Sequence, residues 1–265
     1  MTSSLRRIWA MVYRHLCLYR GSWPRVLELM YWPVVQMMIW AFVTQYTGRF
    51  GGAVAIAAGS LIGAVLLWET ALRSQMGFTI SFLEELWSRN LGNLFVSPIR
   101  PWELVASLTV MSVVRALIGV GTAAALAAAL YAFDITSLGL LLVPFLLNLM
   151  IFGWAVALMV TAMILRHGAG AESLAWSVLF GLAPLSAVFY PVSVLPGWLR
   201  PVSLALPSTH MFEGMRAVLA GGAFPAGELA WAFALNALLL AAAVAIFVGI
   251  FRVARRRGLL LSVGE

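Results

Sequence analysis

Long apolar runs, separated by short polar or proline-rich segments, restrict the fold of this chain more than any other feature. Each run reaches roughly the 20 residues that an α-helix needs to cross the hydrocarbon core of a bilayer. The runs lie at residues 27–47, 52–72, 104–133, 138–165, 171–195 and 228–251. With 63% hydrophobic and only 10% charged residues, the chain has too little polar surface to enclose a soluble core. The sequence therefore predicts an all-α membrane protein in which residues 1–265 form a single domain with six transmembrane helices.

The composition also excludes several kinds of chemistry. All 17 basic residues are arginines, and a P-loop nucleotide site needs a lysine after its glycine-rich turn. Cys17 is the one cysteine, so an internal disulfide is impossible, and the three histidines are too widely spaced to suggest a metal site. We therefore expect no catalytic residues, no metal, no cofactor bound to this chain and no nucleic-acid partner.

The arginines predict how the chain is oriented. If the amino terminus is cytoplasmic, six spans return the carboxyl terminus to the same side of the membrane. All arginines except Arg49, Arg115, Arg200 and Arg216 then lie at or near the cytoplasm. An excess of arginine in cytoplasmic segments is the rule for membrane proteins, so we predict that both termini are cytoplasmic.

Residues 1–22 have the pattern of a helix that lies in the headgroup plane of the membrane. Apolar residues recur at helical spacing on one face, and arginines occupy much of the other. The apolar set is Leu5, Ile8, Trp9, Val12, Leu16 and Tyr19, and the polar set is Arg6, Arg7 and Arg14. Cys17 is either an acylation site or an unmodified packing residue, and the sequence does not decide between them.

The connector between the second and third spans, residues 82–97, predicts an amphipathic helix that ends at Ser97-Pro98. Its polar residues are Glu84, Glu85, Arg89 and Asn90, and its apolar face includes Leu86, Trp87 and Leu91. Aromatic and arginine side chains often anchor protein interfaces, so this helix suits a groove on a partner. The alternative is a helix that touches only lipid, but its mixed charge is unlike that of a lipid-binding surface.

Three charged residues lie close to the hydrocarbon. Glu69 and Arg73 are four residues apart in the second run, and Arg115 enters the third run from the same side. Charges at this depth need a partner or water. They either belong to a transport path or gate, or pair and snorkel at the cytoplasmic boundary of the membrane, and the second interpretation is favoured.

Residues 196–223 contain prolines that divide the segment into pieces too short to span a membrane. We expect short re-entrant or interfacial helices on the outer side. Within them, His210 and Glu213 are three residues apart on one helical face and could serve a membrane-embedded enzyme. A polar turn that caps a short helix explains the same residues, and no nucleophile elbow accompanies them.

The order of these features and two sequence blocks resemble the permease subunits of ABC-2 type transporters. The first block is FLEELWSRNLGNLFVSP followed by RPWE after the second span, and the other is YPVSVLPGWL with LPSTHMFEGMR before the last span. The resemblance covers nearly the whole chain. It implies the transmembrane domain of a bacterial ABC exporter in the inner membrane, with no catalysis of its own.

The resemblance also implies partners and sites. The permease would pair with a second copy or a homologous permease and with two separate subunits that bind ATP and Mg. Residues 82–97 would form the coupling helix that docks on the ATPase, with the amino-terminal helix as a second contact. The coupling contacts would be Glu84, Glu85, Trp87, Arg89, Asn90 and Leu91. The second and fifth spans would line the path, with Gly59, Gly63, Trp68, Phe180, Phe189 and Tyr190 as lining residues, although ordinary helix packing explains each of these equally well.

Two other classes and the cargo stay open at this stage. A secondary transporter would normally show acidic residues near the bilayer midplane or two matching halves, and neither is evident. A membrane-embedded enzyme would depend on His210 and Glu213. The expected lining is aromatic and apolar without a charged subsite, so lipid-linked sugar, polysaccharide and drug all fit as exported substrates.

Overall fold

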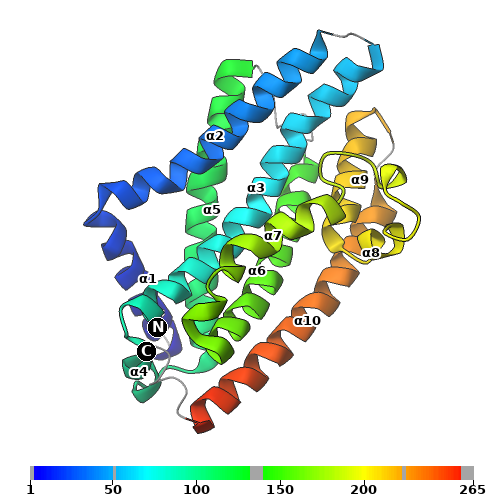
Figure 1. Cartoon of the computed structure of the whole chain (residues 1–265). Helices are drawn as coiled ribbons and strands as arrows, with labels where there is room; N and C mark the ends of the chain where they lie inside the picture. The colour runs from blue at the N-terminus through cyan, green and yellow to red at the C-terminus, as the bar shows by residue number, and fades with distance from the viewer. Residues whose placement is uncertain (1–2, 50–51, 132–139, 223–224, 258–265) are drawn as a thin grey trace.

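The computed structural model describes residues 3–49, 52–131, 140–222 and 225–257, and all regular secondary structure in these ranges is helical. This confirms the predicted all-α class (Figure 1). The longer helices are α1 (Ser3–Arg20), α2 (Trp23–Gly48), α3 (Gly52–Trp87), α5 (Pro101–Tyr131), α6 (Leu142–His167), α7 (Leu174–Leu185), α9 (Pro207–Leu219) and α10 (Ala226–Arg257). The short elements are α4 (Leu91–Val96), η2 (Gly168–Ala171), η3 (Val192–Val194) and α8 (Arg200–Leu204).

Four helices in the described residues are long and apolar enough to cross a membrane: Trp23–Gly48, Pro101–Ala129, Leu142–His167 and Ala226–Arg256. They correspond to the predicted first, third, fourth and sixth spans. The predicted end of the third span at residue 133 and start of the fourth at 138 lie outside the described residues. The predicted second span, 52–72, forms the first part of α3.

Helix α3 is the central element of the bundle because it packs against α5 on one side and α6 on the other. Its 36 residues extend about 54 Å at 1.5 Å per residue, well beyond the bilayer core of about 30 Å. Phe78 and Phe82 on its second half are fully buried together with Leu108 of α5 and Phe152 of α6. A single rigid helix therefore joins the predicted span to the end of the molecule that holds α1 and α4 (Figure 1).

Two glycines let α3 approach its neighbours closely. A Cβ atom on Gly153 of α6 would lie 2.6 Å from the carbonyl oxygen of Ala71 and 2.9 Å from the Cβ of Ser74. A Cβ atom on Gly77 of α3 would lie 2.9 Å from the Cα of Ser112 on α5. Small residues at such crossings are typical of membrane helices, where association depends on close packing.

Replacing Gly153 by leucine is therefore expected to destabilise the protein, because overpacking a close helix crossing costs about 1–3 kcal/mol or more. Thermal unfolding of the purified chain in mild detergent measures the effect. The matched control is Gly121→Leu on α5, where a Cβ atom would meet no other group within 4 Å. Equal unfolding temperatures for the two variants would contradict the close α3–α6 crossing.

The predicted fifth span, 171–195, is not one continuous helix. Helix α7 covers only Leu174–Leu185, about 18 Å at 1.5 Å per residue, which is shorter than the bilayer core of about 30 Å. The chain reverses directly afterwards, where Ala187 adopts a left-handed backbone with φ of 50°. The Tyr190 hydroxyl donates a hydrogen bond to the carbonyl of Pro184 and holds this reversal in place. The apolar run was long enough for a span, but its second half folds back as a loop.

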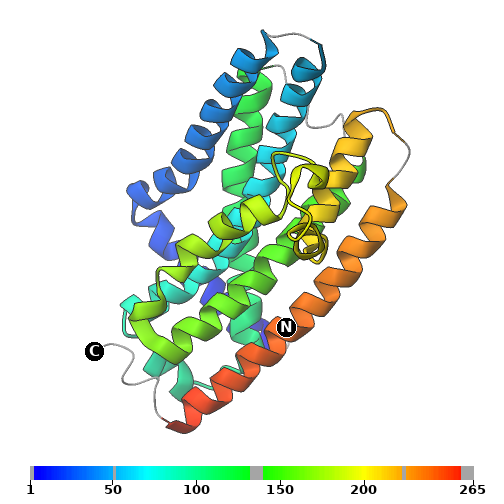
Figure 2. The same ribbon diagram turned by 45° about the vertical axis from the view of Figure 1, so that its right-hand side comes forward.

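Helices α8 and α9 follow this loop within the expected segment 196–223. They lie away from the end of the molecule that holds α1 and α4 (Figure 2). Helix α9 is more than a surface cap, because its side chains Met211, Phe212 and Met215 are fully buried. It packs against α10 and α6, and the ring of Phe212 lies 6.1 Å from that of Trp68 on α3.

Candidate functional site

The segment predicted as one amphipathic helix, residues 82–97, is a helix end, a turn and a second short helix. Helix α3 continues to Trp87, and α4 begins at Leu91. The Asn90 amide donates to the Glu85 carbonyl at 2.9 Å, and the Arg89 amide donates to the Leu86 carbonyl at 2.9 Å. This hydrogen-bond pair is the Schellman motif that ends many helices, with Arg89 in the left-handed position at φ of 52°. The prediction of an unbroken helix was therefore wrong, and we call residues 87–96 the α3–α4 corner.

The α3–α4 corner presents a mixed aromatic, basic and apolar surface. Trp87 is 52% exposed and Val96 is 91% exposed, and Arg89 and Asn93 are also exposed. Leu91 is buried. Asn90 is half-buried, and its side-chain amide donates a hydrogen bond to the Glu85 carboxylate at 2.7 Å. Of the six predicted coupling residues, Trp87 and Arg89 are therefore the ones placed for contact with another protein.

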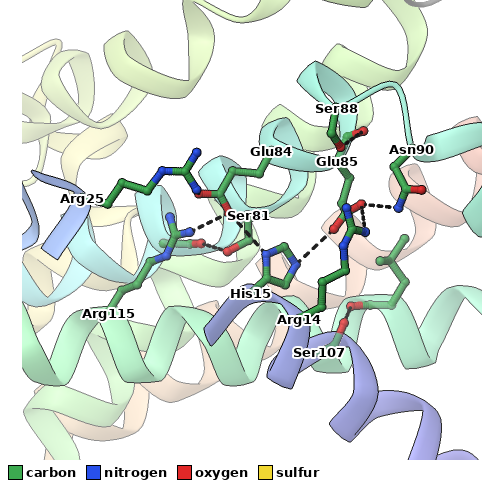
Figure 3. A network of polar contacts seen from close by, with 12 residues as sticks. Arg14, His15, Arg25, Ser81, Glu84, Glu85, Ser88, Asn90, Ser107 and Arg115 are labelled. Carbon is green, nitrogen blue, oxygen red and sulfur yellow. Dashed lines mark hydrogen bonds and ion pairs between the residues drawn. The ribbon is translucent and has the colours of Figure 1, made fainter. Parts of the chain in front are cut away.

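Glu84 and Glu85 point inward, away from that surface, and form a network of ion pairs with arginines and close contacts with His15 (Figure 3). Glu84 accepts a hydrogen bond from Arg115 of α5 at 3.0 Å, and its carboxylate lies 3.2 Å from His15 Nδ1 of α1. Glu85 pairs with Arg14 of α1, and its other oxygen lies 3.5 Å from His15 Nε2. The two carboxylates thus fasten α1 and α5 to the end of α3.

The arginine face of helix α1 meets the protein. Arg7 forms a two-point ion pair with Glu103 of α5, at 2.9 and 2.7 Å, and Arg14 pairs with Glu85 of α3. Leu5, Trp9 and Tyr13 form an outer stripe that is more than half exposed, whereas Val12 of the predicted apolar set is buried. The exposed stripe suits a helix in the headgroup plane, and the arginines hold that helix to the bundle.

The network shifts the ionisation of its members. Burial alone would raise the pKa of Glu84, but the hydrogen bond from His15 and the charges of Arg115 and Arg25 outweigh it, so the pKa is lowered from its ordinary value. Burial raises the pKa of Tyr19 to about 12, although the nearby Arg115 opposes the shift. The Arg115 guanidinium lies 5.0 Å from the centre of the Tyr19 ring, which gives a cation–π contact.

The lowered pKa of Glu84 predicts a pH dependence of stability. A carboxylate with a lowered pKa in the folded state stabilises the fold above its ordinary pKa of 4.5, and this contribution is lost as the pH falls through the lowered value. The difference in unfolding temperature between the native chain and Glu84→Gln should be largest above pH 4.5 and should shrink in more acidic buffer. A difference that grows on acidification would contradict the ionised state of Glu84.

The α3–α4 corner is also joined to α7. The Trp87 indole donates a hydrogen bond to Glu172 at 3.1 Å, and Glu172 lies between η2 and α7. Near the middle of α3, the Gln75 amide donates to the Ala175 carbonyl of α7 at 3.1 Å. A displacement of the corner would therefore act on α1, α5 and α7 together.

A cavity of about 390 Å³ opens beside this network, between the helices α2, α3, α5 and α7 and the end of α1. The three boundary charges Glu69, Arg73 and Arg115 all line it, and Arg73 donates to Glu69 at 2.9 Å as their spacing predicted. The Glu69–Arg73 pair agrees with the pairing interpretation, and the position of all three charges on the cavity agrees with the alternative, in which they belong to a transport path. The expectation of a lining without charged side chains does not describe this cavity.

The cavity contains one of the predicted lining residues, Phe180. Gly63 and Trp68 are buried in helix packing, Phe189 stacks on Trp40 at 4.4 Å, and Tyr190 holds the loop after α7. Gly59 lies in residues 51–60, whose side-chain environment is outside the described part of the structure. Several further residues that line the cavity were not predicted from the sequence, among them Tyr19, Arg25, Glu28, Trp32 and Trp176. The pair Arg25 and Glu28 near the start of the first run was the available signal, but charges at the edge of a span are common.

His210 and Glu213 have separate hydrogen-bond partners in the described residues. His210 Nδ1 lies 2.6 Å from Glu228 of α10, and its other nitrogen lies 2.9 Å from the Leu204 carbonyl. Glu213 accepts hydrogen bonds from Arg216 and from the Val192 amide. Each side chain thus ties α9 to a neighbouring element, and the two carboxylates and the imidazole do not converge on one cavity.

Comparison with known proteins gives one family. The family model described as ABC-2 type transporter matches residues 6–220, which include most of α1, the α3–α4 corner, the residues that line the cavity and α9. No curated protein matches the chain.

Proposed function

Because the chain belongs to the ABC-2 type transporter family, we propose that it is the permease subunit of an ATP-driven exporter. Members of this family are generally non-catalytic membrane components of transporters. The substrate is hydrophobic or amphiphilic, in the class of lipid-linked sugars, polysaccharides or drugs. The observation that carries the proposal is α3, a single helix that has the exposed α3–α4 corner at its end and lines the cavity with Glu69, Arg73 and Met76.

The proposed coupling begins at the α3–α4 corner. Trp87 and Arg89 contact one of two separate ATP-binding subunits, which hold the ATP and Mg and supply the energy. Trp and Arg side chains frequently provide most of the binding energy at protein interfaces. Glu84 and Glu85 act inside the permease, where their ion pairs pass a displacement of the corner to α1 and α5.

A rigid-body displacement of this kind suits alternating access. Closure of the ATP-binding subunits pushes on the corner, and α3 carries the motion to the cavity. The Trp87–Glu172 hydrogen bond brings α7 along with α3. Transport then proceeds between this permease and a second copy of it, or a homologous permease.

The distribution of arginine supports the proposed orientation. Helix α1 and the C-terminal end of α10 lie at the same end of the molecule as the α3–α4 corner (Figure 1). Arg6, Arg7 and Arg14 on α1 and Arg252, Arg255 and Arg256 on α10 therefore share that end. We place this end at the cytoplasmic face of a bacterial inner membrane, with Leu5, Trp9 and Tyr13 of α1 in the headgroup region.

Affinity purification of the tagged chain in mild detergent tests the proposal. The expected result is a stoichiometric nucleotide-binding subunit in the eluate and ATPase activity that the isolated ATP-binding subunit lacks or shows more weakly. A chain that purifies reproducibly from native membranes without any ATPase would contradict the assignment and return the gradient-driven class to consideration.

A further inference from the structure

Three arginine guanidinium groups face the cavity with few of their N–H groups engaged. Arg73 donates to Glu69 at 2.9 Å, and Arg115 donates to Glu84 at 3.0 Å. Arg25 approaches Glu84 only to 3.8 Å, and both Arg25 and Arg115 are directed toward that carboxylate (Figure 3). Each guanidinium has five N–H donors, so the cavity holds many more donors than its described protein acceptors use.

Arg115 shows this imbalance most clearly. The residue is 2% exposed, and its Nε is buried without a hydrogen-bond partner in the described residues. A buried donor without a partner costs free energy, so natural sites of this kind usually receive an acceptor from a ligand or from water. Since the guanidinium fork matches the oxygen atoms of phosphate and carboxylate groups, the missing acceptor is best supplied by an oxyanion.

The carboxylates in the cavity do not reverse this preference. Glu69 is committed to Arg73, and Glu84 is shared by His15, Arg115 and Arg25. Glu28 and Arg25 are both exposed, where water screens their charges. The inner pairs Arg73–Glu69 and Arg115–Glu84 balance in charge, so the deep part of the cavity offers hydrogen-bond donors that these two carboxylates leave unused.

The rim of the cavity has a different chemistry. Trp32 on α2 is 53% exposed, and on α7 Trp176 is 40% and Phe180 is 53% exposed. These side chains line the same cavity as the arginines. Aromatic side chains provide a large apolar contact surface, so the rim suits a hydrocarbon chain that leaves the cavity between α2 and α7.

We propose that this cavity binds the anionic, phosphate-bearing headgroup of an amphiphile, with its apolar chain against Trp32, Trp176 and Phe180. The inference rests on the proposed function in one respect, because it narrows the substrate class of the permease. A volume of about 390 Å³ accommodates a headgroup and leaves the chain outside. The occupant is either the exported substrate or an anionic lipid of the bilayer, since both present the same headgroup chemistry.

Binding of a fluorescent lysophosphatidic acid to the purified full-length chain in detergent tests the proposal. The comparison probe carries the same labelled chain on an uncharged glycerol headgroup. The phosphate probe should bind more tightly than the neutral probe to the native chain. Arg25→Gln should weaken the phosphate probe about tenfold, the loss expected for one charge-assisted hydrogen bond, and leave the neutral probe unchanged.

Arg25 is the informative position because its exposed side chain has only a long contact of 3.8 Å to Glu84, so we expect its replacement to keep the fold, and the unfolding temperature of the variant checks this. Arg20→Gln is the matched control, since Arg20 is exposed on the neighbouring helix end and does not line the cavity. Arg25→Lys should retain part of the affinity. Equal binding of the two probes, or equal loss in the Arg20 and Arg25 variants, would overturn the proposal.

The binding measurement needs no ATP-binding subunit, so its outcome is independent of the purification test of transport function. Reconstitution of the complete transporter in vesicles then separates the two sources of the headgroup. ATP-dependent movement of the phosphate probe to the opposite leaflet identifies it as a substrate. A probe that binds but stays in its leaflet identifies the cavity as a site for a resident anionic lipid, and both results uphold the headgroup site.

Discussion

Replacing Arg115 by leucine should cost the protein about 3–5 kcal/mol of folding free energy, the usual effect of removing one member of a buried ion pair. Arg115 is 2% exposed and donates to Glu84, whose side chain is 9% exposed. Without Arg115, the Glu84 carboxylate keeps the His15 ring at 3.2 Å and Arg25 at 3.8 Å as its polar neighbours. The measurement is denaturant or thermal unfolding of the purified chain in detergent, monitored through the spectroscopic signal of a buried side chain.

The double variant Arg115→Leu with Glu84→Leu distinguishes an unpaired charge from a packing defect. Replacement of both partners by apolar residues can be nearly neutral, so the double variant should recover much of the loss. Arg20→Leu removes an exposed arginine outside this network and should change stability little. A double variant as unstable as the sum of its two single variants would show that Arg115 and Glu84 do not act as a pair.

The second large effect is expected at the α3–α4 corner, where Trp87→Ala combined with Arg89→Glu should abolish most ATP-driven transport. Both side chains are exposed, and truncating a Trp or Arg at the centre of an interface typically costs about 2 kcal/mol or more. A loss of 2 kcal/mol corresponds to about thirtyfold in affinity, so the combined loss should weaken docking of the ATP-binding subunit by more than about thirtyfold. Transport into vesicles and the amount of co-purified ATPase are the two measurements.

The control for this variant is Trp231→Ala combined with Arg49→Glu, which changes the same residue types on the N-terminal part of α10 and at the end of α2. Trp231 is 63% exposed and Arg49 is exposed. This variant should keep its ATP-binding partner. The corner variant should lose little unfolding temperature, since the Trp87–Glu172 hydrogen bond is an exposed one and Glu84, Glu85 and the α1 ion pairs are unchanged. Full transport by the corner variant would remove Trp87 and Arg89 from the coupling mechanism.

The fold class could be predicted from the sequence because the long apolar runs place the backbone in lipid, where a helix satisfies its polar groups internally. The Glu69–Arg73 pair was also predictable, since residues four apart share a helix face. The break between α3 and α4 was not, because the left-handed position is held by Arg89, where glycine is the usual signal. The short length of α7 was missed because hydropathy shows that residues 186–195 are apolar but not that they fold back.

The candidate site shows a further limit of sequence patterns. A helical wheel finds the arginine face of α1 but contains no information about the partners of that face, Glu85 and Glu103, which lie 71 and 96 residues away along the chain. The same long-range pairing turns Glu84 and Glu85 from surface residues into internal ones. Trp87 and Arg89 on the exposed side of the turn could be chosen for contact only once the turn was known.

Site-specific photo-crosslinking shows whether the α3–α4 corner faces an ATP-binding subunit. A photoreactive amino acid replaces Val96, which is 91% exposed at the corner, and in a parallel sample replaces Leu238, which is 73% exposed on α10. After irradiation of native membranes, the account predicts a crosslink from position 96 to a nucleotide-binding subunit and none to that subunit from position 238. No such crosslink from position 96, in membranes where the ATP-binding subunit still co-purifies with the chain, would contradict the account.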